Sequence, residues 1–129
     1  MVVNKHSNMK NLNLKALLFL ALVVSLSSFT MSYQIFPTSM RITVISRLGN
    51  PVENAHVTIY QNRDDYENEE NAIAGPELTD RKGRVTFKNL EEKQYYVQVV
   101  KGDDSNYGDA EQTNKLEKGK MNKFNIVIQ

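Results

Sequence analysis

Polar and apolar residues alternate with a period of two in five separate runs from Arg41 onward. The runs are RITVIS (41–46), AHVTIY (55–60), RVTF (84–87), YYVQVV (95–100) and KFNIVI (123–128). Successive side chains leave opposite faces of a β-strand, so this alternation is typical of half-buried antiparallel strands. No comparable period of 3.6 residues occurs in this part of the chain, which therefore predicts an all-β domain.

Turn-forming residues separate these runs. They are Gly49-Asn50-Pro51, Asp80 to Gly83, Gly102-Asp103-Asp104 and Lys118-Gly119-Lys120. Glycine, asparagine and aspartate supply the backbone conformations that tight turns require. Two weaker strands are predicted at Ala72–Thr79 and Ala110–Leu116. Seven short strands at intervals of about ten residues predict one seven-stranded antiparallel β-sandwich over residues 41–129.

The first 32 residues have the pattern of an export signal. Basic residues precede an apolar stretch from Ala16 to Leu26, and small polar residues follow it. Cleavage is predicted after Ser32 or near Ser28, and translation could begin at Met1 or Met9. The alternative is an uncleaved anchor, since the span from 12 to 36 is long enough to cross a bilayer of about 30 Å. Residues 33–40 would form a linker. Both alternatives predict an exported domain that is periplasmic, on the cell surface or extracellular.

Composition excludes several classes of site. The chain has no cysteine, so disulfides, thiolate metal sites and cysteine nucleophiles are excluded. Three of the 16 basic residues lie in the first 15 positions, whereas all 15 acidic residues follow position 50, with the signs interleaved. This balance shows no basic stripe in the sequence and predicts that nucleic acid is not a partner.

Three segments carry a resemblance to a known family. "GNPVENAHVTIY", "LTDRKGRVTFKNL" and "KQYYVQVVKG" resemble the carboxypeptidase regulatory-like domain family over about residues 41–101. The resemblance implies a prealbumin-like, Greek-key sandwich, similar in shape to collagen-adhesin B-type repeats and starch-binding-like folds. Each matching position has a packing or turn role, so the resemblance predicts a scaffold. The matching positions are Gly49, Pro51, Val52, Ala55, Val57, Thr79, Asp80, Gly83, Val85, Phe87, Leu90, Tyr95, Val97 and Val99.

No catalytic group is predicted. Hydroxyisourate hydrolases of similar shape need paired histidines. Of the two histidines here, His6 lies in the export segment, which leaves His56 alone on an outward strand position. An acid/base site needs a partner within hydrogen-bond reach, and the sequence nominates none. The internal Lys–Asn cross-link of some related domains is also not expected. Arg41 occupies the first strand in place of a lysine, and Asn125 has outward parity in the last strand. No cofactor is predicted.

Two groups of residues remain as candidates for binding. Acidic residues of the turns could hold calcium through their carboxylate oxygens, although such loops are most often solvated. These residues are Asp80, Asp103, Asp104 and Asp109. Outward tyrosines could stack on a sugar or a partner protein, or could stabilise the sheet instead. They are Tyr60, Tyr96 and Tyr107, with Tyr66 beside them.

These observations predict a secreted or cell-envelope module without catalytic activity. Its main predicted role is protein interaction or structural support, with another envelope or extracellular protein as partner. A carbohydrate-binding module that uses the outward tyrosines is the alternative, although the chain has no tryptophan for stacking on sugars. A calcium-stabilised surface domain is a further alternative. The membrane would be contacted only through an uncleaved N-terminal segment.

Overall fold

The structure is a computed structural model that describes residues 6–27, 34–109 and 112–129. Contacts divide the chain into two units after Gln34. The first contains helix α1, His6–Ser27. Among the residues described, no helix combines the length and apolar character needed to cross a membrane. Both predicted cleavage positions fall within residues 28–33, outside the described residues.

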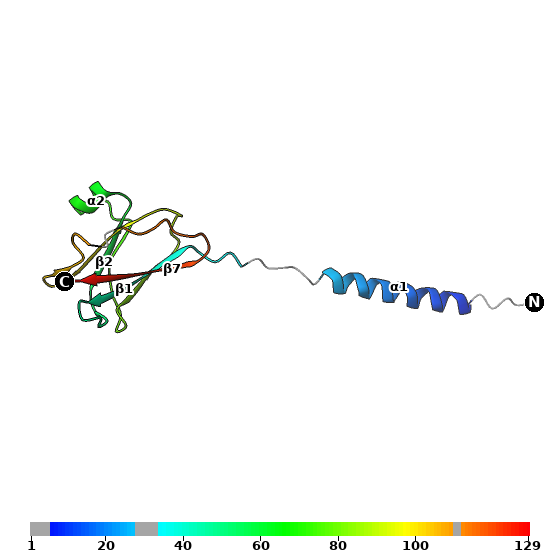
Figure 1. Cartoon of the computed structure of the whole chain (residues 1–129). Coiled ribbons are helices and arrows are strands. Elements are labelled where there is room, and N and C mark those ends of the chain that lie inside the picture. Colours follow the sequence, from blue (N-terminus) through cyan, green and yellow to red (C-terminus); the bar gives the residue numbers. More distant parts are fainter. Residues whose placement is uncertain (1–5, 28–33, 110–111) are drawn as a thin grey trace, which may run out of the picture. The chain divides into compact units, whose positions relative to one another are not determined.

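In the second unit, Ile35–Gln129, the described residues form seven strands in two sheets (Figure 1). One sheet has the order β4-β1-β7, and the other has the order β3-β2-β5-β6. The strands are β1 (Ser39–Ser46), β2 (His56–Tyr60), β3 (Ala74–Leu78), β4 (Arg84–Phe87), β5 (Tyr96–Lys101), β6 (Asp104–Ser105) and β7 (Met121–Ile128). The fold is therefore the predicted β-sandwich, and β1 begins two residues before the predicted run.

The hydrophobic core lies between the two sheets and uses one parity of each strand. In β1 the inward residues are Met40, Ile42 and Val44, all fully buried. Val57 and Ile59 of β2 face them from the other sheet, and both are fully buried. Apolar area removed from water is the main stabilising term of such a sandwich. The predicted inward parity of these strands is thus confirmed.

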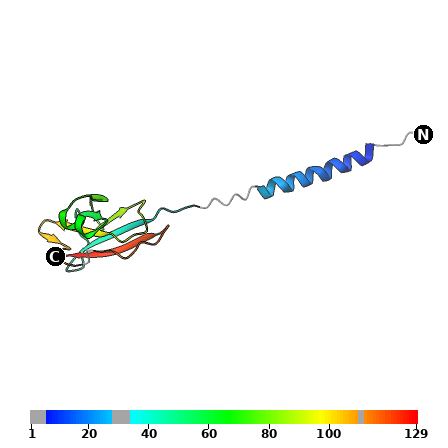
Figure 2. The same cartoon turned by 90° about the horizontal axis from the view of Figure 1, so that it is seen from above.

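The prediction of an entirely antiparallel arrangement is wrong for one pair of strands. β1 pairs with β4 antiparallel but with β7 parallel, from Ser39 opposite Met121 to Ser46 opposite Ile128. Figure 2 shows β1 and β7 side by side. After β6 the chain returns to the beginning of β1, where the Ser39 N–H donates to the Lys120 carbonyl at 3.0 Å. Alternation reports which face a residue occupies, not the direction of its neighbour, so it missed this pairing.

Two further elements differ from the prediction. Residues 63–68 form a short helix, α2 (Arg63–Asn68), in a segment for which no helix or strand was predicted. The predicted strand at 110–116 is not formed in its described part, 112–116, which contributes a single bridge between Gln112 and Tyr96. Residues 110 and 111 lie outside the described residues. The sixth strand of the chain is instead β6, which lies earlier in the sequence and pairs with the end of β5.

Two glycines with positive φ offer a matched test of the sandwich. Gly49 has a φ of +83° and open space around an added Cβ, whereas at Gly83, with a φ of +72°, a Cβ would lie 2.4 Å from the Val44 carbonyl oxygen. We expect Gly49→Ala to lower the free energy of unfolding by about 1–2 kcal/mol through backbone strain alone. Gly83→Ala should cost more, because a backbone contact is added. Urea unfolding followed by tyrosine fluorescence measures both, and equal losses would contradict the close approach.

Candidate functional site

The residues that carry the family resemblance form turns and inter-strand contacts. Thr79 is buried, and its hydroxyl donates to the Val52 carbonyl at 2.6 Å and accepts from the Ala55 N–H at 2.9 Å. Pro51 forms a bridge with Ile45 across the first turn. Other members of this set lie in the core: Val57, Val85, Phe87, Tyr95, Val97 and Val99 are buried. These residues hold the strands and turns in place, and they assemble no catalytic group.

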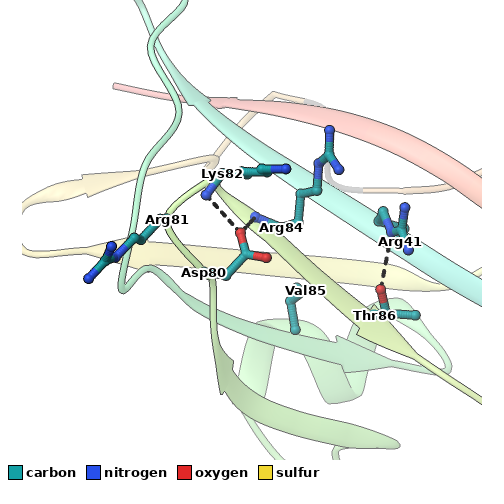
Figure 3. Close-up of a pocket in the computed structure, with 7 residues that line it drawn as sticks. All are labelled: Arg41, Asp80, Arg81, Lys82, Arg84, Val85 and Thr86. Carbon is teal, nitrogen blue, oxygen red and sulfur yellow. Dashed lines mark hydrogen bonds between the residues drawn. The ribbon is translucent and has the colours of Figure 1, made fainter.

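Asp80 fixes the turn between β3 and β4. Its Oδ1 accepts hydrogen bonds from the backbone N–H of Lys82 at 2.8 Å and of Arg84 at 3.0 Å (Figure 3). These bonds, first the one from Arg84, hold the pKa of the Asp80 carboxyl below its ordinary value, and the charges of both side chains add to the effect. The Val44 N–H also donates to the Gly83 carbonyl at 2.7 Å, which ties the turn to β1.

The acidic residues that could hold calcium are not brought into one cluster. Asp80 occupies the β3–β4 turn, where its carboxylate is committed to the backbone. Asp103 and Asp104 lie at the β5–β6 turn, and Asp109 follows that hairpin. Within the described residues, no group of three or more histidine, cysteine or acidic side chains has a geometry that could hold a metal ion. The geometry therefore offers calcium no assembled set of ligands.

The outward tyrosines meet beneath helix α2. The Tyr66 ring, which α2 supplies, lies 5.9 Å from Tyr60, 5.8 Å from Tyr96 and 6.2 Å from Tyr107, measured between ring centroids. Edge-on and offset aromatic pairs at such distances are attractive. α2 contacts β2 and β5, so it covers the outer face of the four-stranded sheet at these two strands.

Burial of these rings changes the prediction made for them. Tyr60 has the outward parity that was predicted, but it is only 3% exposed because α2 covers it. Burial raises the pKa of its phenol, and the Glu69 carboxylate adds to the rise. The expectation that Tyr60 offers an open face to a sugar is wrong for this reason. Tyr96 is half-buried, and Tyr107 is 66% exposed, so Tyr107 is the ring that remains open to a partner.

Polar contacts complete the docking of α2. The Asn62 side chain accepts from the Asp65 N–H at 2.9 Å and caps the helix, which satisfies one of its free donors. At the other end, the Gln98 side-chain amide of β5 donates to Glu69 at 2.7 Å. Asn62 followed three residues later by Asp65 is the signal that would have predicted this helix.

The surface of α2 and the residues after it is acidic. Four of its carboxylates belong to exposed residues: Asp64, Glu67, Glu69 and Glu70. Arg63 pairs with Glu67 at 2.7 Å across one helical turn. Tyr107 stacks on Tyr66 beside this helix. We call Tyr107 with these four carboxylates the acidic surface.

A second surface was missed by the sequence analysis. A pocket of about 520 Å³ lies along β4, the edge strand of the three-stranded sheet, and is drawn in Figure 3. The register of β1 and β4 places Arg41 opposite Thr86, and the Arg41 Nε donates to the Thr86 hydroxyl at 3.3 Å. The lining residues are Arg41, Asp80, Arg81, Lys82, Arg84, Val85 and Thr86. We call this site the cationic pocket; only the strand register reveals it, because Arg41 is far from the turn in sequence.

Two residues weighed for chemistry have the expected exposure. His56 is exposed at the beginning of β2, and Asn125 is exposed on the outward face of β7. The inward positions of β1 hold apolar side chains, and Arg41 points to the outer face. These positions provide no buried lysine and asparagine pair in β1 and β7.

Comparison with solved structures finds similar folds in several longer proteins, among them the following three. The TIE protein of Bacillus anthracis superposes with a TM-score of 0.51 and 20% identity over 72% of this chain and 17% of its own. BcpA, the major pilin subunit of Bacillus cereus, in its D312A form, superposes with a TM-score of 0.50 and 12% identity. The match covers 71% of this chain and 28% of BcpA. A streptococcal ancillary pilin superposes with a TM-score of 0.54 and 14% identity, over 74% of this chain and 33% of its own.

These similarities show the fold, a sandwich of the type found in pilin domains. The chain spans a third or less of the length of each of these proteins. No family profile matches the sequence, and a sequence search of curated proteins finds no match. The likeness to carboxypeptidase regulatory-like domains therefore rests on the quoted sequence segments alone.

Replacing Tyr66 tests whether the tyrosine cluster stabilises the fold. We expect Tyr66→Ala to lower the free energy of unfolding by about 3 kcal/mol, because a buried ring that contacts three others is lost. Tyr107→Ala is the matched control, and its exposed ring should contribute less than about 1 kcal/mol. Urea unfolding with tyrosine fluorescence provides the values. If Tyr66→Ala and Tyr107→Ala had the same free energy of unfolding, the contacts of α2 with the sheet would not depend on the Tyr66 ring.

The Asp80 carboxylate predicts a defined dependence on pH. Its pKa is lowered on folding, so its stabilisation is present above the ordinary value of 3.8 and disappears as the pH falls through the lower folded value. We expect wild type to be more stable than Asp80→Asn at neutral pH, and the difference to vanish in strong acid. Unfolding free energies measured between about pH 6 and pH 2 test this. A difference that stays constant over this range would exclude the charge as its source.

Proposed function

We propose that this protein is an exported interaction module of the cell envelope that binds another protein through its acidic surface and has no catalytic role. The observation that carries the proposal is the similarity of its sandwich to pilin domains, together with an exposed ring beside α2. One of these proteins is named as the major pilin subunit of its organism, which supports a structural or interaction role. The apolar stretch from Ala16 to Leu26 supports export, either as a cleaved signal or as an anchor.

The acidic surface suits a protein partner better than a glycan. Of the tyrosines considered for stacking, Tyr60 is covered and Tyr96 is half-covered, so a sugar would find one open ring rather than a platform. The exposed carboxylates of the acidic surface favour a partner with a basic surface, since complementary charge speeds association and selects the partner. Aromatic residues are enriched at the centre of protein interfaces, which gives Tyr107 the role of anchor.

Photo-cross-linking in intact cells tests the proposed function. A photoreactive residue in place of Tyr107 should give one adduct of constant mass, and one in place of Asn125 should not, because Asn125 lies on the other sheet. Reversing charge with Asp64→Lys and Glu70→Lys should abolish the adduct by opposing a basic partner.

The matched control makes the same change in net charge elsewhere. Glu92→Lys with Asp103→Lys alters two exposed acids outside the acidic surface and should leave the adduct intact. Loss of the adduct in both double variants would show that net charge, not this surface, is responsible. No adduct from the protein that carries the photoreactive residue at position 107, with all four carboxylates intact, would exclude the acidic surface as the interface.

A further inference from the structure

We propose that the cationic pocket binds a ligand that carries at least two phosphate groups. This site lies on β1, β4 and the β3–β4 turn, in contrast to the acidic surface on α2, so the inference is independent of the protein partner proposed above. The argument rests on the charge of the lining, its rigidity and the kinds of side chain present.

The lining is strongly unbalanced in charge. It holds four cations and one acid, which leaves a formal excess of three positive charges. Within the described residues, Arg41, Lys82 and Arg84 make no ion pair with a neighbouring acid; Arg81 approaches Glu53 at 4.0 Å, and both side chains are largely exposed. Like charges held together repel one another, and a bound anion removes that cost.

The framework that carries these cations is rigid. The β3–β4 turn is closed by the Asp80 N–H bond to the Arg84 carbonyl at 2.9 Å and by the bonds of the Asp80 carboxylate. Gly83 approaches β1 so closely that no Cβ could fit there. Arg41 is half-buried and bonded to Thr86. A backbone that is already ordered loses less entropy when a ligand binds, which favours binding at this turn.

The residue types select phosphate. Three of the four cations are arginines, whose planar guanidinium groups match phosphate oxygens with paired hydrogen bonds. No aromatic side chain lines the pocket, so it has no platform for stacking nucleic acid bases. The volume of about 520 Å³ fits a ligand with several phosphates better than a single small anion. Soluble oligophosphates and the headgroups of lipids with two phosphates, such as cardiolipin, share this chemistry.

Titration calorimetry with the full chain tests the site, with tripolyphosphate as the probe. We expect tripolyphosphate to bind more tightly than inorganic phosphate, because it engages several cations at once. Arg41→Gln with Arg84→Gln should weaken tripolyphosphate binding at least about tenfold, through loss of two charge-assisted contacts. It should also reduce the slope of log K against log salt concentration.

Two further variants keep the result interpretable. Lys82→Gln with Arg84→Gln leaves the Arg41–Thr86 bond intact and should show the same loss, which covers the case in which the first variant folds poorly. Lys115→Gln with Lys118→Gln removes the same charge from exposed positions outside the pocket and should bind as wild type does. Equal weakening in this control would overturn the proposal.

Vesicle sedimentation identifies the source of the phosphate. The quantity compared is binding to vesicles of cardiolipin, which carries two phosphates, and phosphatidylcholine minus binding to phosphatidylcholine alone, so that any adsorption of the apolar N-terminal segment cancels. A difference that both pocket variants abolish, and the lysine control keeps, supports a lipid headgroup. Tripolyphosphate binding without such a difference supports a soluble oligophosphate. Failure of the wild-type chain to respond to either probe would overturn the inference.

Discussion

The alternation of strand β1 is the constraint on which both the core and the cationic pocket depend. Its inward residues, Met40, Ile42 and Val44, are fully buried against the second sheet. Pairing with β4 on one side and β7 on the other leaves this strand no freedom to slip, because a shift of one residue would exchange its two faces. The same register that buries Ile42 therefore places Arg41 on the outer face. Packing of the core therefore determines the position of Arg41.

The β3–β4 turn joins architecture to charge. Asp80 and Gly83, which the family resemblance marks as scaffold positions, shape the turn through backbone hydrogen bonds and a close approach to β1. Because the turn has this conformation, its other residues, Arg81, Lys82 and Arg84, line the pocket. A scaffold signature can thus determine the position of a binding surface without itself contacting a ligand.

The sequence predicted the strands whose alternation is visible in the chain. It did not predict the features that depend on contacts between distant segments. The five alternating runs correspond to β1, β2, β4, β5 and β7, because burial of one face imposes a period of two. The direction of a neighbouring strand leaves no pattern in the sequence, so the parallel pairing of β1 and β7 was not predicted. α2 is too short for a helical period, and its cap, Asn62 and Asp65, was the only local signal. Tyr60 has outward parity yet is covered by that helix. The cationic pocket needed the pairing of Arg41 with Thr86 to become visible.

The near balance of charges in the sequence conceals a separation in space. Acidic side chains gather on α2, which lies over the four-stranded sheet, whereas the cationic pocket lies along the edge strand of the other sheet. Packed sheets are about 10 Å apart, and charges in physiological salt are screened over about 8 Å. Each surface therefore presents its own sign to the solvent. Net charge is a poor guide to the partners of such a sandwich, because an approaching ligand responds to the face it meets.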